Sequence, residues 1–169
     1  MAGRRPGGEQ PVTDRVSQRN PWLVLACFLG VVAVVAVVGA LAAASAKDVY
    51  ARLELPLWAP PSSLFGPVWT VLYVLIAVSG WLYWRTDGET RGFAAYGIGL
   101  LANLLWTPLF FEGGAAQAAL VDILVLDVVV VVTIVLFARR SKAAAALLVP
   151  YLAWILYATA LNTAIVTLN

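Results

Sequence analysis

The stretch LPLWAPPSSLFGPVWTVLYVLIAVSGWLYW, residues 55–84, decides how this chain folds. A loop rich in proline and tryptophan leads directly into an apolar run that is long enough to cross a bilayer, since about 20 helical residues span the hydrocarbon core. Pro56, Pro60 and Pro61 fix the backbone of the loop and remove amide donors. The stretch therefore predicts a membrane helix that follows a stiff, non-helical loop with large aromatic side chains.

Charge is scarce in this chain and unevenly placed. Of its 169 residues, 62% are hydrophobic and 12% are charged, whereas soluble domains carry roughly 25% charged residues. No Lys, Arg, Asp or Glu occurs from Pro21 to Ala46 or from Ala143 to Asn169. Five runs are long enough to cross a bilayer as helices, at about residues 22–46, 64–84, 93–111, 115–138 and 143–168.

The expected fold class is an all-α integral membrane protein, a bundle of five transmembrane helices. Lipid cannot satisfy exposed backbone groups, so only helices and closed barrels span a bilayer, and the alternation typical of barrel strands is absent from this sequence. Residues 1–21, which contain several Gly, Pro and Arg, are expected to form a disordered cytoplasmic tail. Residues 22–169 are expected to form one transmembrane domain.

Basic residues indicate the orientation of the bundle, because cytoplasmic loops carry an excess of Lys and Arg. Nine lie in the N-terminal tail and in the second and fourth connections, and two lie in the first connection. The N-terminus is therefore expected in the cytoplasm and the C-terminus outside, in a bacterial cytoplasmic membrane. Because the basic residues act as topology signals, the net charge of +2 gives no reason to expect nucleic acid as a partner.

The chain has one cysteine, Cys27, and no histidine. A Cys/His metal site and a His-dependent catalytic triad are therefore excluded. Neither a metal nor a cofactor is expected, and no acid–base constellation in the sequence supports conventional catalysis.

When the spans alternate in direction, the deep polar residues and the deep aromatic residues within them fall in the same half of the predicted bundle. Trp69 and Tyr73 lie four residues apart and so share one helix face. Asn103 lies near the middle of the third span, with Trp106 one turn further out. In the fifth span, candidates follow one another at spacings of 3, 4 and 4, namely Tyr151, Trp154, Ala158 and Asn162.

A ligand pocket is predicted in this half, closed by the loop that carries Tyr50 and Trp58. Polar groups inside a bilayer are costly and face the bundle interior or a cavity, so two amides and one or two carboxylates are expected beside Trp, Tyr and Phe walls. Such a pocket suits a large planar apolar molecule with a few polar substituents. For the loop, the alternative is an interfacial aromatic anchor.

The same residues also have structural interpretations. Asn103 and Asn162 are expected either to contact a ligand or to hydrogen-bond neighbouring helices. Asp127 lies near the middle of the fourth span, and for Asp122, which is nearer a span end, a structural role is favoured. In the first span, alanines recur every four residues, as at Ala36, which either lets helices approach closely or reflects a composition rich in Val and Ala.

Four blocks of this chain resemble the TspO/MBR family, the tryptophan-rich sensory proteins and the mitochondrial translocator (peripheral benzodiazepine receptor-like) proteins. The order and spacing of the blocks match the family over about residues 47–169. The blocks are LxLPxWAPPSSLFGPVWTVLY at 53–73, LLANLLWTPLFF at 100–111, ALVDILVL at 119–126 and LLVPYLAWILYATALN at 147–162.

The resemblance implies a five-helix bundle, often dimeric, that binds its ligands under the first loop. The implied ligands are tetrapyrroles such as protoporphyrin IX and sterol-like or drug-like apolar molecules. Pocket positions of the family match Trp58, Asn103 and Ala158. Some bacterial members are reported to promote light-dependent porphyrin breakdown, and the tryptophans tied to that activity match Trp69 and Trp154.

This chain departs from the family pattern in three places. Val49 stands where the family usually has the Trp of a Trp-Tyr pair, and Leu55 stands where it usually has a Lys before the loop proline. A cation for a ligand carboxylate is therefore missing. No Lys or Arg follows Lys142, so the C-terminal cholesterol motif of animal members does not occur.

The leading functional prediction is a membrane receptor or sensor for porphyrin-like ligands. A transporter of porphyrin-like or lipid-like molecules is an alternative, although no internal repeat is visible. A light-dependent porphyrin-degrading enzyme, with Trp69 and Trp154 as its catalytic residues, is another and rests on resemblance alone. The expected partners are an apolar small molecule, membrane lipid and a second copy of the chain. The predicted ligand-binding residues are Tyr50, Trp58, Trp69, Tyr73, Asn103, Trp106, Tyr151, Trp154, Ala158 and Asn162.

Overall fold

The computed structural model describes residues 20–43, 48, 52–111 and 116–169. Within these residues the regular structure is helical and contains no strand. The long helices are α1 (Pro21–Ala42), α3 (Phe65–Arg85), α4 (Thr90–Phe111), α5 (Ala116–Ala138) and α6 (Lys142–Leu168), and the short 3-10 helix η1 (Ser62–Leu64) leads into α3. By length and composition, all five long helices can cross a membrane. The expected all-α bundle of five transmembrane helices is confirmed.

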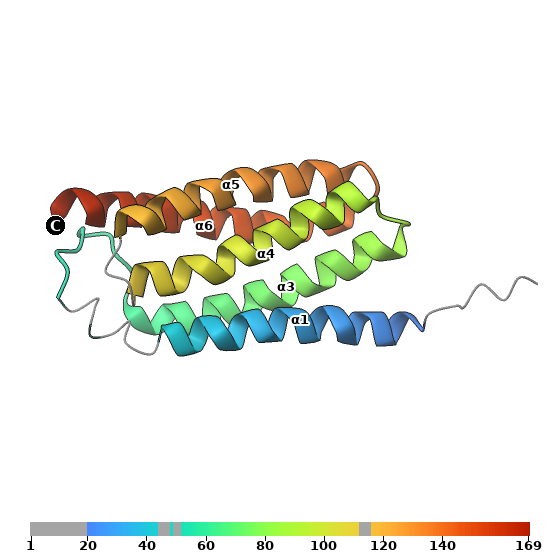
Figure 1. Cartoon of the computed structure of the whole chain (residues 1–169), viewed down its shortest axis with the longest axis horizontal. Helices are drawn as coiled ribbons and strands as arrows, with labels where there is room; N and C mark the ends of the chain where they lie inside the picture. The colour runs from blue at the N-terminus through green and yellow to red at the C-terminus, as the bar shows by residue number, and fades with distance from the viewer. Residues whose placement is uncertain (1–19, 44–47, 49–51, 112–115) are drawn as a thin grey trace, which may run out of the picture.

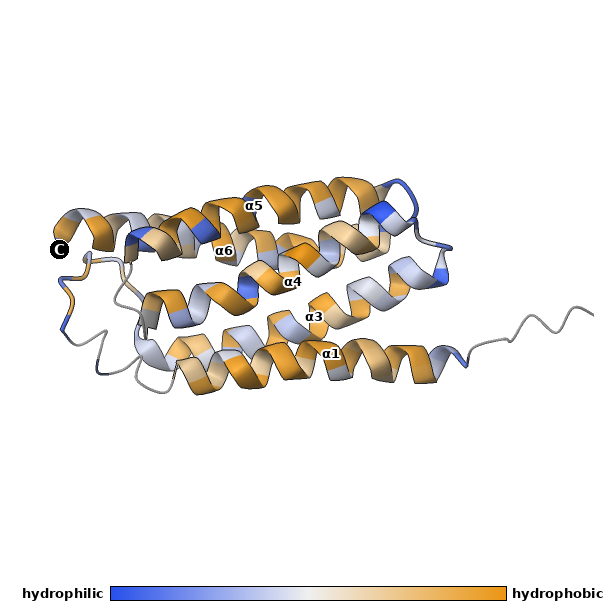
Figure 2. Ribbon diagram, in the orientation of Figure 1, coloured by the Kyte–Doolittle hydropathy of each residue, from blue (hydrophilic) through white to orange (hydrophobic). Residues whose placement is uncertain are grey.

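The contacts between the long helices form a closed ring, and consecutive helices run in opposite directions (Figure 1). α1 packs against α3 and α4, α3 packs against α6, and α5 packs against both α4 and α6. Apolar residues cover the outside of the helices as well as the core, and hydrophilic residues lie mainly at the helix ends and turns, with a few bands within the helices (Figure 2). A bundle that is apolar all round is suited to a lipid environment.

Side-chain caps set where two of the helices begin. Asn20 caps α1 by accepting a hydrogen bond from the amide of Trp22 at 3.0 Å, and Pro21 occupies the first turn. Ser141 caps α6 by accepting a hydrogen bond from the amide of Ala144 at 3.2 Å. Each cap satisfies an amide that has no partner inside the helix, which favours starting the helix at that residue.

At one end of the bundle, the α3–α4 turn and the α5–α6 turn meet around the buried Tyr83. Its ring stacks on Phe137 with centroids 3.9 Å apart and planes 7° apart, and its hydroxyl accepts a hydrogen bond from the amide of Glu89 at 2.9 Å. The Glu89 carboxylate pairs with the Arg140 guanidinium at 2.6 Å. The side-chain hydrogen bond from Arg140 to the Glu89 carboxylate, together with the positive charge of Arg140, holds the pKa of Glu89 below its ordinary value. These contacts tie the two turns together.

At the opposite end, the first loop is fastened to α6. The Asn169 side chain accepts a hydrogen bond from the Glu54 amide at 3.0 Å and donates one to the Glu54 carbonyl at 3.2 Å. The Tyr157 hydroxyl donates to the Trp58 carbonyl at 3.0 Å. The apolar loop residues Leu53, Leu55 and Ala59 pack against a cluster of Phe110, Ala119, Leu161 and Ile165. The described part of the loop therefore lies over the ends of α4, α5 and α6.

Candidate ligand-binding site

A cleft of about 980 Å³ lies between α1 and α3, in the half of the bundle next to the first loop. One wall is α1 from Leu29 onward together with Ala43, which directly follows the helix, and the facing wall is η1 with the first turns of α3. Trp106 and Thr107 of α4 form the floor. Ligand pockets in proteins commonly have volumes of roughly 300–1,000 Å³, so this cleft is at the large end of that range.

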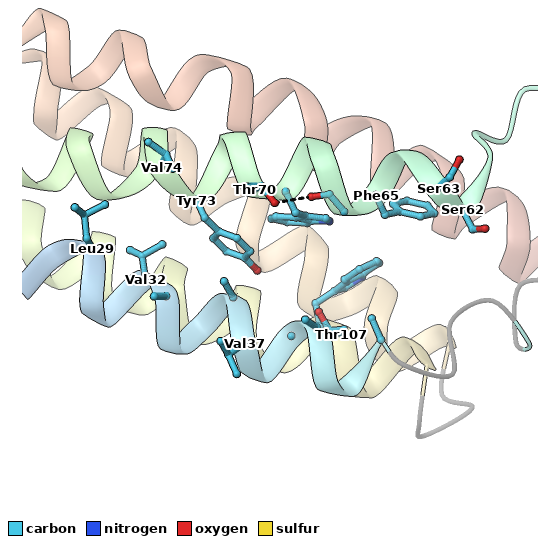
Figure 3. Close-up of a pocket in the computed structure, with 18 residues that line it drawn as sticks. Leu29, Val32, Val37, Ser62, Ser63, Phe65, Thr70, Tyr73, Val74 and Thr107 are labelled. Carbon is cyan, nitrogen blue, oxygen red and sulfur yellow. Dashed lines mark hydrogen bonds between the residues drawn. The ribbon is translucent and has the colours of Figure 1, made fainter. Parts of the chain in front are cut away.

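Aromatic rings form the α3 wall of the cleft (Figure 3). Trp69 and Tyr73 lie one turn apart and stack with centroids 5.2 Å apart and planes 29° apart. Phe65 lies one turn before Trp69, and Trp106 approaches from α4. In Figure 3, the hydroxyl of Tyr73 points across the cleft towards α1. A flat apolar molecule in the cleft would therefore meet both ring faces and ring edges.

The α1 wall is made largely of small residues, namely Ala33, Ala36, Gly39, Ala40 and Ala43. A methyl group added at Gly39 would lie 3.5 Å from the Tyr73 hydroxyl and 3.7 Å from the Thr107 hydroxyl. These two hydroxyls give the floor of the cleft its polar spot. Sequence reasoning did not assign any α1 residue to the site. The signal was the alanine spacing through Ala36, but spacing alone does not distinguish a ligand wall from a helix contact.

Asn103 lies behind the cleft and connects two tyrosines. The Tyr73 hydroxyl donates to Asn103 Oδ1 at 3.1 Å, and Asn103 Nδ2 donates to the Tyr151 hydroxyl at 3.2 Å. Asn103 and Tyr151 are each 4% exposed, and neither lines the cleft. The hydrogen bonds join α3, α4 and α6, and they hold the Tyr73 hydroxyl in place at the floor of the cleft. Of the two interpretations of Asn103, the geometry favours the structural one.

Two further polar candidates, Asn162 and Asp127, make contacts between helices. Asn162 is 1% exposed, and its amide donates to and accepts from the backbone of the first turn of α5 in the orientation that satisfies both of its polar atoms. Asp127 is 8% exposed and accepts a hydrogen bond from the Thr159 hydroxyl at 2.8 Å, which joins α5 to α6. Asp122 and Asp127 are not among the described residues that line the cleft.

Phe65 and Trp106 separate the cleft from a second space of only about 20 Å³, since both residues line both spaces. A space of that size holds about one water molecule. Trp154 meets Phe65 edge to face at 6.1 Å. The second space is lined by Phe65, Trp106, Phe110, Trp154, Tyr157, Ala158, Leu161 and Asn162. The structure thus divides Trp154, Ala158 and Asn162 from the cleft that Trp69 and Tyr73 line. Tyr151, the other predicted α6 residue, lines neither space and meets Trp69 edge to face at 6.2 Å.

Trp58, one of the two loop residues predicted to close the pocket, is not among the described residues that line the cleft. Trp58 is 49% exposed and meets Tyr157 edge to face at 5.7 Å, and Tyr50 lies outside the described residues. Of the predicted ligand-binding residues, the cleft therefore brings together Trp69, Tyr73 and Trp106.

The chemistry of the described walls is that of a binding site for an apolar molecule. No charged side chain is found among the described residues that line the cleft. No group of three or more His, Cys, Asp or Glu that could hold a metal ion gathers anywhere in the described part of the chain. Stacking, apolar burial and hydrogen bonds to hydroxyl groups are the interactions that this cleft offers.

Comparison with known proteins identifies the family. The sequence profile of the TspO/MBR family matches residues 26–168. The chain is 42% identical over 129 residues to the tryptophan-rich protein TspO of Archaeoglobus fulgidus, covering 75% of this chain and 84% of that protein. It is 33% identical over 148 residues to the tryptophan-rich sensory protein of Cereibacter sphaeroides, covering 88% and 92%. It is 36% identical over 118 residues to the translocator protein of Homo sapiens, covering 67% and 70%. This integral membrane protein therefore belongs to the TspO/MBR family.

Proposed function

We propose that this protein is a membrane receptor or sensor that binds a tetrapyrrole such as protoporphyrin IX, or a similarly flat apolar molecule, in the cleft between α1 and α3. The observation that carries the proposal is the cleft itself, about 980 Å³ in volume and walled by Phe65, Trp69, Tyr73 and Trp106 against small residues of α1. Aromatic contacts contribute roughly 0.5–1.5 kcal/mol each beyond the burial of area. Several such contacts in one cleft favour a flat ring system over a flexible chain.

Polar groups of the ligand have two places to lie. One is the floor of the cleft, where the hydroxyls of Tyr73 and Thr107 both lie within 4 Å of the place that a Cβ at Gly39 would take. The other is the mouth next to the first loop, where Ser62 and Ser63 line the cleft and are exposed. Because the described walls carry no charge, a ligand carboxylate would remain at that mouth, where water and lipid headgroups solvate it.

The names of the relatives refer to two activities, sensing and translocation. A translocator needs a path through the bundle, whereas a receptor needs only a site. The half of the bundle opposite the cleft is packed around the stacked rings of Tyr83 and Phe137, both of which are at most 1% exposed. That packing supports a receptor, so transport remains the second candidate.

Light-dependent porphyrin breakdown is the enzymatic alternative. Trp69 lines the cleft and would contact a bound porphyrin, whereas Trp154 lines the separate small space behind Phe65. If breakdown occurs, Trp69 is therefore expected to matter more than Trp154 for the first contact between a tryptophan and the ring. Illuminating the complex and following loss of the Soret band tests this alternative directly.

The proposal includes an orientation and an assembly. We place the N-terminus in the cytoplasm of a bacterial cell and propose a homodimer in the membrane, as the family resemblance implies. The orientation is supported by the described basic residues, since Arg52 lies at the end of the bundle that holds the cleft and the opposite end holds Arg85, Arg91, Arg139, Arg140 and Lys142.

The proposal is tested by titrating the protein in lipid nanodiscs with protoporphyrin IX and following quenching of tryptophan fluorescence. Ala36 lines the cleft, so Ala36→Phe fills it and should weaken binding about tenfold or more, since overpacking a tight site costs roughly 1–3 kcal/mol. Val128→Phe is the matched control, because Val128 is 64% exposed on α5. If Ala36→Phe binds as tightly as the parent, the ligand does not occupy this cleft.

A further inference from the structure

The cleft is open along the seam between α1 and α3. Some of the residues that line it also belong to the outer surface of the bundle, with Val37 58% exposed and Val74 50% exposed. On the two long helices, the exposed lining residues in addition to these two are Leu29, Ala33 and Ala40 of α1 and Gly66 and Thr70 of α3. All of them lie in membrane-spanning helices, so the solvent at this opening is the bilayer.

The chemistry of the seam suits the passage of an apolar molecule. Its α1 side carries alanine methyl groups and valine, and on its α3 side Gly66 has no side chain. Among the exposed lining residues of α1 and α3, only Thr70 carries a hydroxyl, and it donates to the Gly66 carbonyl at 2.9 Å (Figure 3). A threonine that bonds back to its own helix presents little unsatisfied polarity to its surroundings. Bulky rings begin only deeper in the cleft, at Trp69 and Tyr73.

The aqueous end of the bundle offers a different kind of surface. The described part of the first loop is held to α6 by the three hydrogen bonds of Glu54 with Asn169 and of Trp58 with Tyr157. Moving the loop would break these bonds and expose the apolar cluster under it. The seam requires no such loss.

We propose that the ligand reaches the cleft sideways from the bilayer, between α1 and α3, and that its natural class is therefore a flat apolar molecule already dissolved in the membrane. The inference rests on the proposed function of the cleft and adds the route and the source of the ligand. Any ionised substituent of that ligand stays at the headgroup level near Ser62 and Ser63. The rings slide between the small residues of α1 and the aromatic wall of α3.

The test closes either the seam or the loop with a reversible strap. Cys27 is an exposed thiol on α1, so it is first replaced by serine. In this Cys27→Ser background, a short bis-methanethiosulfonate reagent bridges Val37→Cys and Thr70→Cys across the seam. The matched control bridges Glu54→Cys and Asn169→Cys in the same way, where the loop is already held to α6. Protoporphyrin IX dimethyl ester, which is neutral, is added to proteoliposomes, and tryptophan quenching is followed in time before and after reductant.

The seam strap should slow association and dissociation by the same factor, about tenfold or more, because a route does not change the free energies of its end states. Reductant should restore both rates, and the loop strap should leave them unchanged. The reverse pattern, with slow rates only when the loop is strapped, overturns the inference. If the seam strap also lowers the equilibrium affinity because the reagent fills the cleft, the rates measured with the loop strap distinguish the two routes. Slower binding and release with the loop strapped would exclude entry from the membrane. An unstrapped protein that fails to bind the ester contradicts the proposed function itself.

Discussion

At the scale of single residues, the polar side chains separate into those that build the bundle and those that face the cleft. From sequence, Asn103 and Asn162 had two interpretations that spacing did not separate. The structure gives both amides partners on neighbouring helices. The hydroxyls of Tyr73 and Thr107, in contrast, lie at the floor of the cleft. A residue type in a helix predicts burial, but only the packing of several helices shows which buried group meets a ligand.

We expect Asn103→Leu to lower the stability of the bundle. The change removes hydrogen bonds to Tyr73 and Tyr151 and leaves buried hydroxyls without that partner, at a cost of about 1–3 kcal/mol. Unfolding in a denaturing detergent is measured for the parent, for Asn103→Leu, for Tyr73→Phe and for the double variant. This double-mutant cycle gives the coupling free energy between Tyr73 and Asn103. Additive losses in this cycle would mean that the Tyr73–Asn103 bond contributes no stability. Ligand affinity should fall less than stability, because Asn103 does not line the cleft.

We expect substitution by leucine to lower stability at Ala158 and to weaken ligand binding at Ala36. Ala158 faces a space of about 20 Å³, so Ala158→Leu overpacks it and should lower stability by about 1–3 kcal/mol. Ala36 faces the large cleft, so Ala36→Leu should leave stability nearly unchanged and weaken ligand binding. Thermal unfolding without ligand, followed by a porphyrin titration, separates the two effects. Equal stability of Ala158→Leu and the parent would mean that the second space is larger than the structure indicates.

At the scale of elements, hydropathy predicted that there are five helices but gave no information on which helices are neighbours. The ring in which α1 packs against α3 and α4 follows from side-chain shape. An example is Gly80 of α3, where an added Cβ would lie 2.7 Å from the ring of Phe28 on α1 and 3.0 Å from Tyr96 on α4. Glycine allows the three helices to approach there. No spacing rule identifies such a position, because other glycines of the same helices face open space.

Two glycines of α4 give a matched test of this close approach. A Cβ at Gly92 would overlap the hydroxyl end of Tyr83, which is 1% exposed and stacked on Phe137. Gly92→Ala should therefore destabilise the bundle by about 1–3 kcal/mol. At Gly97 nothing lies within 4 Å of an added Cβ, so Gly97→Ala should be neutral or stabilising by up to about 1 kcal/mol through helix propensity. Detergent unfolding of both variants checks the difference, and a Gly92→Ala protein as stable as Gly97→Ala would contradict it.

The ion pair between the two turns makes a small, pH-dependent contribution to stability. Arg140 lowers the pKa of Glu89 below the ordinary value of 4.5, so the contribution is fully present above that value and is lost as the pH falls through the lower pKa of the folded state. Both side chains are about half exposed, and salt should weaken the pair. We expect Glu89→Gln to lose less thermal stability than the parent between about pH 6 and about pH 3. Equal losses would show that other carboxylates determine the acid response.

At the scale of the whole molecule, the two ends of the bundle are built differently. One end is closed by the stacked Tyr83 and Phe137 and by the Glu89–Arg140 pair, and the other holds the cleft and the fastened first loop. The alternation of span directions was enough to predict that the deep aromatic residues share one end. It was not enough to predict that Phe65 and Trp106 divide that end into a large and a small space, because a partition depends on rotamers and on contacts across helices.

The asymmetry of the ends gives a prediction of topology. The N-terminal start of α1 and the two turns rich in arginine lie at the closed end, which we expect in the cytoplasm. In a Cys27→Ser background, Leu57→Cys in the fully exposed part of the first loop should react with a membrane-impermeant maleimide in intact cells. Thr90→Cys, exposed at the start of α4, should react only after the cells are permeabilised. The opposite labelling pattern would show that the protein lies in the membrane in the inverted orientation. The cleft would remain in place, because its walls depend on helix packing and not on which side of the membrane is the cytoplasm.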